Sequence, residues 1–539
     1  MTTYPAGPPL ADPAELAAIE DAVRWGRADA WWPAPDSVVH GGSAPDDPAV
    51  DLCGDDGDRP MGVLGLVFPA ARAVRDAAVR DVRGLGLPGL ARAVGAAVPL
   101  SGLHDVVVRA FVTDLHAARV AGRLGAGTPQ GRFAEFCADL ATPAGRRAVW
   151  DRYPVLAGHV RGLCGRWHRA VVELAGRLAA DRPGSGELRS LKLGAGDGHR
   201  GGRGVAIAGF EDGEVVYKPR PADADRAFAA LVEWFNATGP PLELSCPAVR
   251  PRAGYAWVEF VEHRAGADPR AYHRRAGALL ALLYAVLGTD MHQENVIARG
   301  DEPVPVDLEA LCAPLARPED WSVARTGLLH TGGVDISGLG GGAPGPHPVP
   351  SPGVRDRGSD TMHLVWANGI RLDWLPNRQV VDGARTRPAD HVDSLVEGFT
   401  DAYDRLARAR CALPAPDGPL HALSTAALRV VLRPTTVYSR LLAERTHPAH
   451  LSDPAEQRKM LALLGSDAVA ATEAAQLAAG DVPLFEFTPT GRDLTAGNGA
   501  VLRNALPHRP YDAVRAVFDR LSDHDLAHQV DLIRAAWPS

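Results

Sequence analysis

The chain has 539 residues, of which 46% are hydrophobic and 23% are charged, and its formal net charge is −8. This composition excludes a largely disordered chain, and the length allows about three domains of ordinary size. Because the charge balance is acidic, no domain-wide basic surface is expected, and we predict no nucleic-acid partner.

The cysteines and the N-terminus bear on where the protein works. The six cysteines are scattered and form no C-x-x-C pair, which argues against a zinc ribbon or a redox dithiol. Residues 1–21 lack the basic and apolar regions of a signal peptide, and the longest apolar stretch, 276–288, is too short to cross a bilayer. We expect a cytoplasmic protein without membrane insertion.

Residues 1–185 are predicted to form a mostly helical N-terminal extension. A short helix is expected over 13–26, and over 61–182 apolar side chains recur at three- and four-residue spacing. The run Arg-Pro-Gly-Ser-Gly over 182–186 is a cluster of helix breakers and marks a domain boundary.

Residues 186–265 are predicted to be rich in β-strands. Two strand-forming runs, GVAIAGF over 204–210 and EVVYK over 214–218, flank Glu211-Asp212-Gly213. Asp-Gly between such runs indicates a hairpin. The other elements expected in this part are a helix over 222–236 and a strand over 257–261.

Residues 266–539 are predicted to form a mostly helical lobe. The elements expected in it are an apolar helix over 272–287, short strands near 295–298 and over 304–307, and helices from residue 390 onward with a break over 413–418.

A glycine motif precedes the predicted hairpin. Gly196, Gly198 and Gly201 fit G-x-G-x-x-G, which is also what a glycine-rich surface loop contains. A dinucleotide-binding fold needs a helix directly after these glycines, and here a hairpin follows. A glycine motif followed by a hairpin suits a loop that lies over nucleotide phosphates. Lys218, at the end of the second strand, would then be the phosphate-binding cation. The alternative for Lys218 is a solvated charge at a strand edge.

Acidic and amide residues cluster downstream. Kinase-like catalysis uses an Asp that receives the hydroxyl proton, an Asn five residues later and a second Asp on a following strand, the last two holding Mg²⁺. Asp290, Asn295 and Asp307 have this order, and His292 and Glu309 add an acid–base group and a further carboxylate. The alternative is an Asp/Asn turn after a helix, with carboxylates that merely flank a strand.

Two arginines near the C-terminus form another candidate site. Arg429 and Arg433 are four residues apart and would share a helical face until Pro434 interrupts the helix. A solvated helix end is one interpretation. A phosphate clamp is the other, because guanidinium groups bind phosphate in a bidentate manner.

Several of these segments are similar to one known family. The run GDGHRGGRGVAIAGFEDGEVVYKPRP over 196–221 resembles the dehydratase domain of class II lanthipeptide synthetases. The same resemblance extends to TDMHQENVIARGDEPVPVDLEAL over 289–311, to the segment 429–438 and to DVPLFEFTPTGRDL over 481–494. It runs from about residue 120 to the C-terminus.

The resemblance implies an α+β, kinase-like bilobal core related to lipid kinases, in which 186–265 is the N-lobe and 266–539 the C-lobe. It also implies a two-step reaction on a ribosomal precursor peptide. ATP, with Mg²⁺, first phosphorylates Ser or Thr hydroxyls. Phosphate is then eliminated, which leaves dehydroalanine or dehydrobutyrine.

The resemblance also implies roles for the candidate residues. Asp290 would orient or deprotonate the hydroxyl, and Lys218 would contact phosphate. The remaining matches are Asn295, Asp307 and Glu309 in the metal group, Asp197, His199 and His292 as further active-site positions, and Arg429 with Thr435 as the elimination pair.

One feature of the family is missing from the sequence. The C-terminal cyclase of the full-length family binds zinc through a Cys…Cys-His set, and we find no such set here. We therefore expect a separate lanthionine cyclase to act with this protein, or the product to stay uncyclised. Two other functions remain open, a kinase-like phosphotransferase without elimination and a non-catalytic subunit that binds the precursor peptide.

Overall fold

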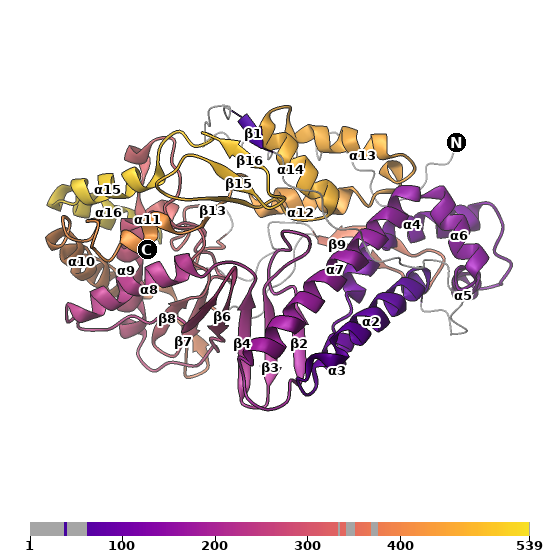
Figure 1. Ribbon diagram of the computed structural model, residues 1–539, viewed down its shortest axis with the longest axis horizontal. Helices are drawn as coiled ribbons and strands as arrows, with labels where there is room; N and C mark the ends of the chain where they lie inside the picture. Colours follow the sequence, from indigo (N-terminus) through magenta and orange to yellow (C-terminus); the bar gives the residue numbers. More distant parts are fainter. Residues whose placement is uncertain (1–36, 40–61, 333–334, 341–350, 368–375, 538–539) are drawn as a thin grey trace.

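The computed structural model describes residues 37–39, 62–332, 335–340, 351–367 and 376–537 (Figure 1). The short helix expected over 13–26 lies outside these residues. The described chain is a mixture of helices and antiparallel sheets. The N-terminal helices gather at one end, on the right of Figure 1, and the helices of the C-terminal half lie mostly at the other.

The N-terminal part is helical from α2 to α7. Thr128 and Thr142 begin α5 and α6, because each hydroxyl accepts a hydrogen bond from a backbone amide three residues later and a proline follows directly. These helices are α2 (Phe68–Val82), α3 (Leu90–Ala96), α4 (Leu100–Val120), α5 (Pro129–Leu140), α6 (Pro143–Arg152) and α7 (Pro154–Asp181). Within the described residues, Leu90–Val120 is long and apolar enough to span a membrane by length and composition. Here it comprises α3 and α4, and α4 buries Leu103 and Phe111 in the N-terminal core.

The first five-stranded sheet follows α7 and has the order β2-β3-β4-β6-β5. The predicted hairpin is confirmed, because Phe210 pairs with Gly213 across a turn made by Glu211 and Asp212. The strands are β2 (Ser190–Leu193), β3 (Ala206–Phe210), β4 (Gly213–Lys218), β5 (Val249–Arg252) and β6 (Tyr255–Glu259). Side chains of β3 and β4 share a hydrophobic core with α7, which runs beside this sheet in Figure 1.

A second hydrophobic core contains side chains of α9 (Pro269–Ala285), which packs against α10 (Val392–Arg408), and side chains of α8 (Asp223–Ala237). Asp268 begins α9, since its carboxylate accepts the amides of Arg270 and Ala271. The hairpin of β7 (Val296–Arg299) and β8 (Glu302–Pro305) follows α9. The helices predicted over 222–236 and 272–287 and the two short strands after them are thereby confirmed within about three residues.

The C-terminal part contains a second sheet that we did not predict. Its order is β1-β16-β15-β14-β13, so the early strand β1 pairs with the last one. The strands are β1 (Ser37–Val39), β13 (Leu428–Val430), β14 (Phe485–Phe487), β15 (Leu494–Ala496) and β16 (Val501–Arg503). Each has three residues, which is too short for an alternating pattern to stand out in the sequence.

The remaining elements are short strand pairs and helices. The pairs are β9 (Ser351–Arg355) with β10 (His363–Ala367) and β11 (Val380–Val381) with β12 (Ala384–Arg385). The helices are α11 (His421–Thr425), α12 (Thr435–Glu444), α13 (Pro454–Leu461), α14 (Ala468–Ala479), α15 (Pro510–Arg520) and α16 (Asp523–Ala535).

Candidate active site

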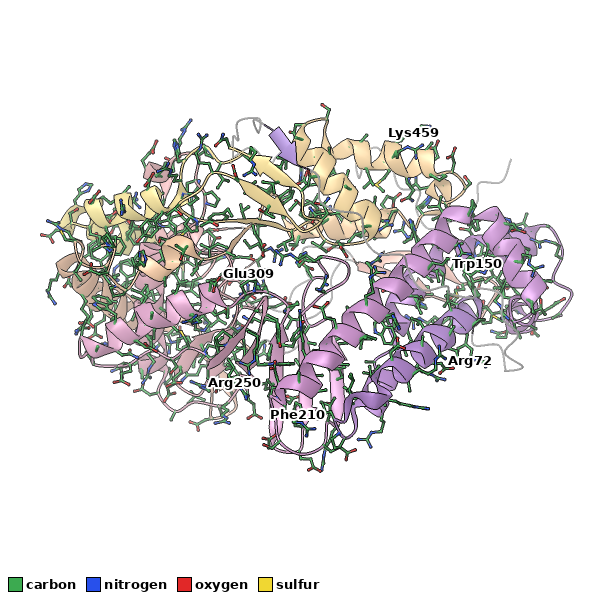
Figure 2. All side chains as sticks on the ribbon, viewed as in Figure 1. Arg72, Trp150, Phe210, Arg250, Glu309 and Lys459 are labelled. Carbon is green, nitrogen blue, oxygen red and sulfur yellow. The ribbon has the colours of Figure 1, made fainter. Side chains whose placement is uncertain are left out.

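Four segments meet near the centre of the molecule, around Glu309, which Figure 2 labels between the two five-stranded sheets. They are the glycine loop before β3, the end of β4, the chain that follows β8, and β13 with β14. They enclose a cavity of about 90 Å³. Its lining includes Gly196, Asp197, His199, Lys218, Arg220, Asp307, Glu309, Arg429 and Glu486.

Lys218 is buried at the end of β4, so the interpretation as a solvated edge charge is wrong. Its ammonium nitrogen donates to Asp225 Oδ1 of α8 at 3.0 Å and to the Val306 carbonyl at 2.7 Å. It also lies 4.0 Å from Asp307 Oδ1. A single lysine therefore connects the first sheet, α8 and the loop that carries Asp307.

Arg220, two residues after Lys218, contacts three carboxylates. Its guanidinium nitrogens lie 2.6 Å from Asp225 Oδ2, 3.1 Å from Asp307 Oδ1 and 2.9 Å from Glu309 Oε2. Burial alone would raise the pKa of Asp225, but the cations of Arg220 and Lys218 outweigh burial and lower it to about 2. Arg220 and Asp225 were not among the residues predicted from the sequence. The only signal was an arginine close to Lys218 and an acidic first turn in the next helix.

Glu309 pairs with two arginines. Its Oε1 atom accepts from Arg429 Nη1 at 2.6 Å, its Oε2 atom lies 2.9 Å from Arg220 Nε, and its carbonyl accepts the Arg429 amide. Although burial opposes ionisation, Arg220 and Arg429 lower the pKa of Glu309 to about 2. Both carboxylate oxygens are thus engaged by guanidinium groups.

The turn after α9 holds Asp290, His292 and Asn295. Asp290 has a left-handed backbone (φ 65°), and the Asn295 amide stabilises this turn by donating to the Asp290 carbonyl at 2.7 Å. His292 Nε2 lies 3.9 Å from Asp290 Oδ1. The carbonyl of Asn295 accepts the Val306 amide at 2.9 Å, and this bond joins the turn to the segment that contacts Lys218.

The surroundings of Asp290 and Asp307 disfavour the ionised forms of their carboxyl groups. Burial raises the pKa of both carboxyl groups, and the charge of Glu309 adds to this effect at each. Arg220, Lys218, His292 and Arg429 oppose the shift but do not cancel it. With the amide oxygen of Asn295, these carboxylates are the hard ligands that Mg²⁺ prefers, so this part of the site fits a divalent cation.

The glycine loop lies against β13 and the chain that leads into β14. Asp197 Oδ2 is 3.8 Å from Arg429 Nη2, and His199 Nδ1 is 2.7 Å from the Val482 carbonyl. Burial and then the charge of Arg429 lower the pKa of His199. Gly196 lines the cavity, the Gly198 carbonyl accepts the Val482 amide, and the Gly201 amide donates to Asp481.

Arg429 and Arg433 do not share a helical face, and that expectation was wrong. Arg429 lies in β13, and its neighbours on the paired strand hold it in extended backbone. Arg433 is 1% exposed and its Nε donates to Glu473 at 2.9 Å, so the two arginines do not form a clamp. Thr435 is the first residue of α12.

The structure therefore brings most predicted residues into two adjoining groups. One contains Lys218, Asp307 and the turn of Asp290 and Asn295, and the other contains Glu309, Arg429 and the glycine loop. Six predicted residues lie outside the lining of the cavity described above, namely Gly198, Gly201, Asp290, His292, Asn295 and Thr435.

A second group of ligand-type side chains lies away from this site. Glu444, His447 and His450 have donor atoms within 4.8 Å of one another. However, Glu444 Oε2 accepts from Arg109 of α4 at 3.1 Å, and Glu444 Oε1 lies 3.2 Å from His450 Nε2. These contacts account for the group, and the Arg109–Glu444 ion pair links α4 to α12.

Comparisons with known proteins bear on the same region. The family model described as "Domain of unknown function (DUF4135)" matches residues 153–488, which include all the candidate site residues. The chain is also 22% identical over 492 residues to "Lacticin 481/lactococcin biosynthesis protein LcnDR2" of Lactococcus lactis subsp. lactis. That match covers 80% of this chain and 52% of the relative, so the chain spans about half the length of the curated protein it matches.

Proposed function

The chain belongs to the family described as "Domain of unknown function (DUF4135)", and from this premise we propose that it is a dehydratase of lanthipeptide biosynthesis. The relative's name assigns that protein to the biosynthesis of lacticin 481 and lactococcin. The proposed reaction is phosphorylation of Ser and Thr in a ribosomal precursor peptide by ATP, followed by elimination of phosphate. We further propose that the core is kinase-like and that the protein acts in the cytoplasm.

One observation carries the proposal: a buried lysine–aspartate pair, a second aspartate and an Asp–Asn turn adjoin one another. Phosphoryl transfer depends mainly on positioning and charge neutralisation, and a lysine fixed by a helix carboxylate is a recurring part of such sites. Lys218, held by Asp225, supplies the cation for the phosphates. Asp290 accepts the hydroxyl proton while the substrate oxygen attacks the terminal phosphorus and the bond to the ADP oxygen breaks.

Magnesium, when bound, neutralises phosphate charge in this chemistry. Asp307 and Asn295 are the residues that we assign to hold it. Glu309 suits this role less well, because both its oxygens accept from arginines. We assign Glu309 instead to holding Arg220 and Arg429.

Elimination uses the second group of residues. A base removes the Cα proton, the C–H electron pair forms the Cα=Cβ bond, and the Cβ–O bond breaks so that phosphate leaves with its electron pair. Arg429 stabilises the departing phosphate. We assign the base to His199, because its lowered pKa keeps the ring neutral at neutral pH. The Val482 carbonyl can only accept a hydrogen bond, so Nδ1 carries the proton and Nε2 has the free lone pair.

The test is direct. Purified protein is incubated with ATP, Mg²⁺ and a precursor peptide encoded beside its gene, and the products are analysed by mass spectrometry. We expect loss of one water for each modified Ser or Thr, with none in the absence of ATP or in Asp290→Asn. A stable phosphopeptide from the wild-type protein would indicate a phosphotransferase without elimination, and an unchanged peptide that still binds would indicate a non-catalytic subunit.

A further inference from the structure

We propose that Asp481 is a positioning residue that locks the glycine loop in place, and that phosphate elimination depends on this lock more than phosphoryl transfer does. The second half of this inference rests on the proposed function. The first half concerns the loop alone and does not require any substrate.

The lock is a carboxylate bound by two consecutive amides. Asp481 Oδ2 accepts the Gly201 amide at 2.6 Å, and Oδ1 accepts the Gly202 amide at 2.9 Å. Both glycines have φ near +81°, a conformation that favours glycine. Successive amides in such a turn form a concave site for anions such as phosphate. Here the protein's own carboxylate fills that site, so these amides are not available to a nucleotide.

Neighbouring contacts extend the lock over the whole loop. The Val482 amide donates to the Gly198 carbonyl at 2.9 Å, and the Val482 carbonyl contacts His199. Arg200 forms an ion pair with Glu486 of β14. The loop is therefore fastened to the segment 481–486, which lies about 280 residues further along the chain.

Helix α7 supports the other side of the loop. Arg166 Nε lies 3.8 Å from Asp481 Oδ1, and Arg166 also donates to the Ala479 carbonyl at the end of α14. A Cβ atom on Gly202 would lie 2.9 Å from Arg166 Cβ, so a side chain would not fit there without movement. Asp481 is buried between these partners.

The lock affects in particular the residues that we assign to phosphate elimination. Asp197 and His199 lie on the locked loop, and both interact with the charge of Arg429. By contrast, Lys218 and Asp307 are held by Asp225, Arg220 and the Val306 carbonyl. Among the contacts of the described residues, none joins Asp481 to this second set. Loosening the loop should therefore displace His199 and Asp197 and leave the phosphoryl-transfer residues in place.

The first experiment measures hydrogen exchange in Asp481→Ala and Asp481→Asn. Amides of residues 198–205 should exchange faster in both variants than in the wild-type protein. The increase should be smaller in Asp481→Asn, because asparagine keeps one side-chain oxygen that can accept a hydrogen bond. Asp493→Asn is the matched control. Asp493, which directly precedes β15, also accepts a backbone amide, from Asn504 at 2.8 Å, and pairs with Arg503 of β16. Unchanged exchange over 198–205 in both Asp481 variants would overturn the lock.

The second experiment measures products, using ATP, Mg²⁺ and the precursor peptide that the wild-type protein dehydrates. The ratio of phosphopeptide to dehydrated peptide should rise about tenfold in Asp481→Asn, as expected from the loss of one hydrogen bond at a preorganised site. Asp493→Asn should keep the wild-type ratio. An equal loss of both activities would contradict the specific role in elimination. If the wild-type protein modifies no peptide, the proposed function fails, whereas the exchange data still decide whether the lock exists.

Discussion

Arg429 and Arg433 are separated by three residues and have different roles because their partners differ. Arg433 is almost fully buried, with Glu473 as its ion-pair partner and the Leu464 carbonyl as a further acceptor. Arg429 instead lines the central cavity and pairs with Glu309. Removing one partner of a buried pair is costly because it leaves the other charge without compensation.

Replacing each arginine by methionine should separate these roles. Arg433→Met should lower the free energy of unfolding by about 3–5 kcal/mol, since the Glu473 carboxylate remains buried and unpaired. Arg429→Met should cost less stability, because Arg220 still pairs with Glu309, and should accumulate phosphopeptide. Urea denaturation and mass spectrometry measure the two effects. Complete dehydration by Arg429→Met would contradict the assignment of Arg429.

At the level of elements, α9 and α10 cross at two glycines. A Cβ atom on Gly277 would lie 1.9 Å from the Leu395 carbonyl oxygen, and one on Gly398 would lie 1.8 Å from that of Arg274. The two backbones are thus in direct contact. This crossing matters for the candidate site, because the turn with Asp290 begins shortly after α9 ends.

Gly277→Ala should therefore be destabilising, by about 1–3 kcal/mol, because the helices must move apart. Gly158→Ala in α7 is the matched control. Gly158 has open space around its Cβ position, so alanine there should stabilise the helix by roughly 0.5–1 kcal/mol. Chemical denaturation of both variants gives the comparison. Equal effects of the two substitutions would show that helix propensity, and not close packing, governs position 277.

The short elements also limit what a sequence can reveal. The hairpin before Lys218 and the apolar helix α9 were predictable, because each has a strong local pattern. The strand that carries Arg429 was not, since three residues flanked by helices give no period. Asp225, Arg220 and Asp481 were missed for another reason. Their roles arise from contacts with partners elsewhere in the fold, and no local pattern marks them.

On the scale of the whole molecule, the buried His273 and the partly buried His159 make stability depend on pH. Burial lowers the pKa of His273 to about 4 and that of His159 to about 3. In the unfolded chain these groups have a pKa near 6.5, so the unfolded state binds more protons below that pH. Their contribution to stability is fully present above about pH 6.5 and is lost progressively as the pH falls towards 4.

His273→Asn should reduce this dependence. The asparagine amide can still donate to the Pro269 carbonyl, which His273 Nδ1 contacts at 2.7 Å. Between pH 7 and pH 5, the unfolding free energy of the variant should fall by about 2 kcal/mol less than that of the wild type. Urea titrations at the two pH values provide the measurement, with His524→Asn, at an exposed position of α16, as the control. Parallel changes in all three proteins would refute the role of His273.

The long separation between the glycine loop and its carboxylate partner has a consequence for synthesis. A ribosome that adds roughly 5–20 residues per second needs about 15–60 s to travel from Gly201 to Asp481. Once Asp290 has been added, and until Asp481 follows, the emerging chain contains Lys218 and Asp290 but no Asp481 to fasten the loop. If the proposed function holds, a nascent or truncated chain without Asp481 should be unable to carry out the elimination step, so dehydration can be completed only once translation is almost finished.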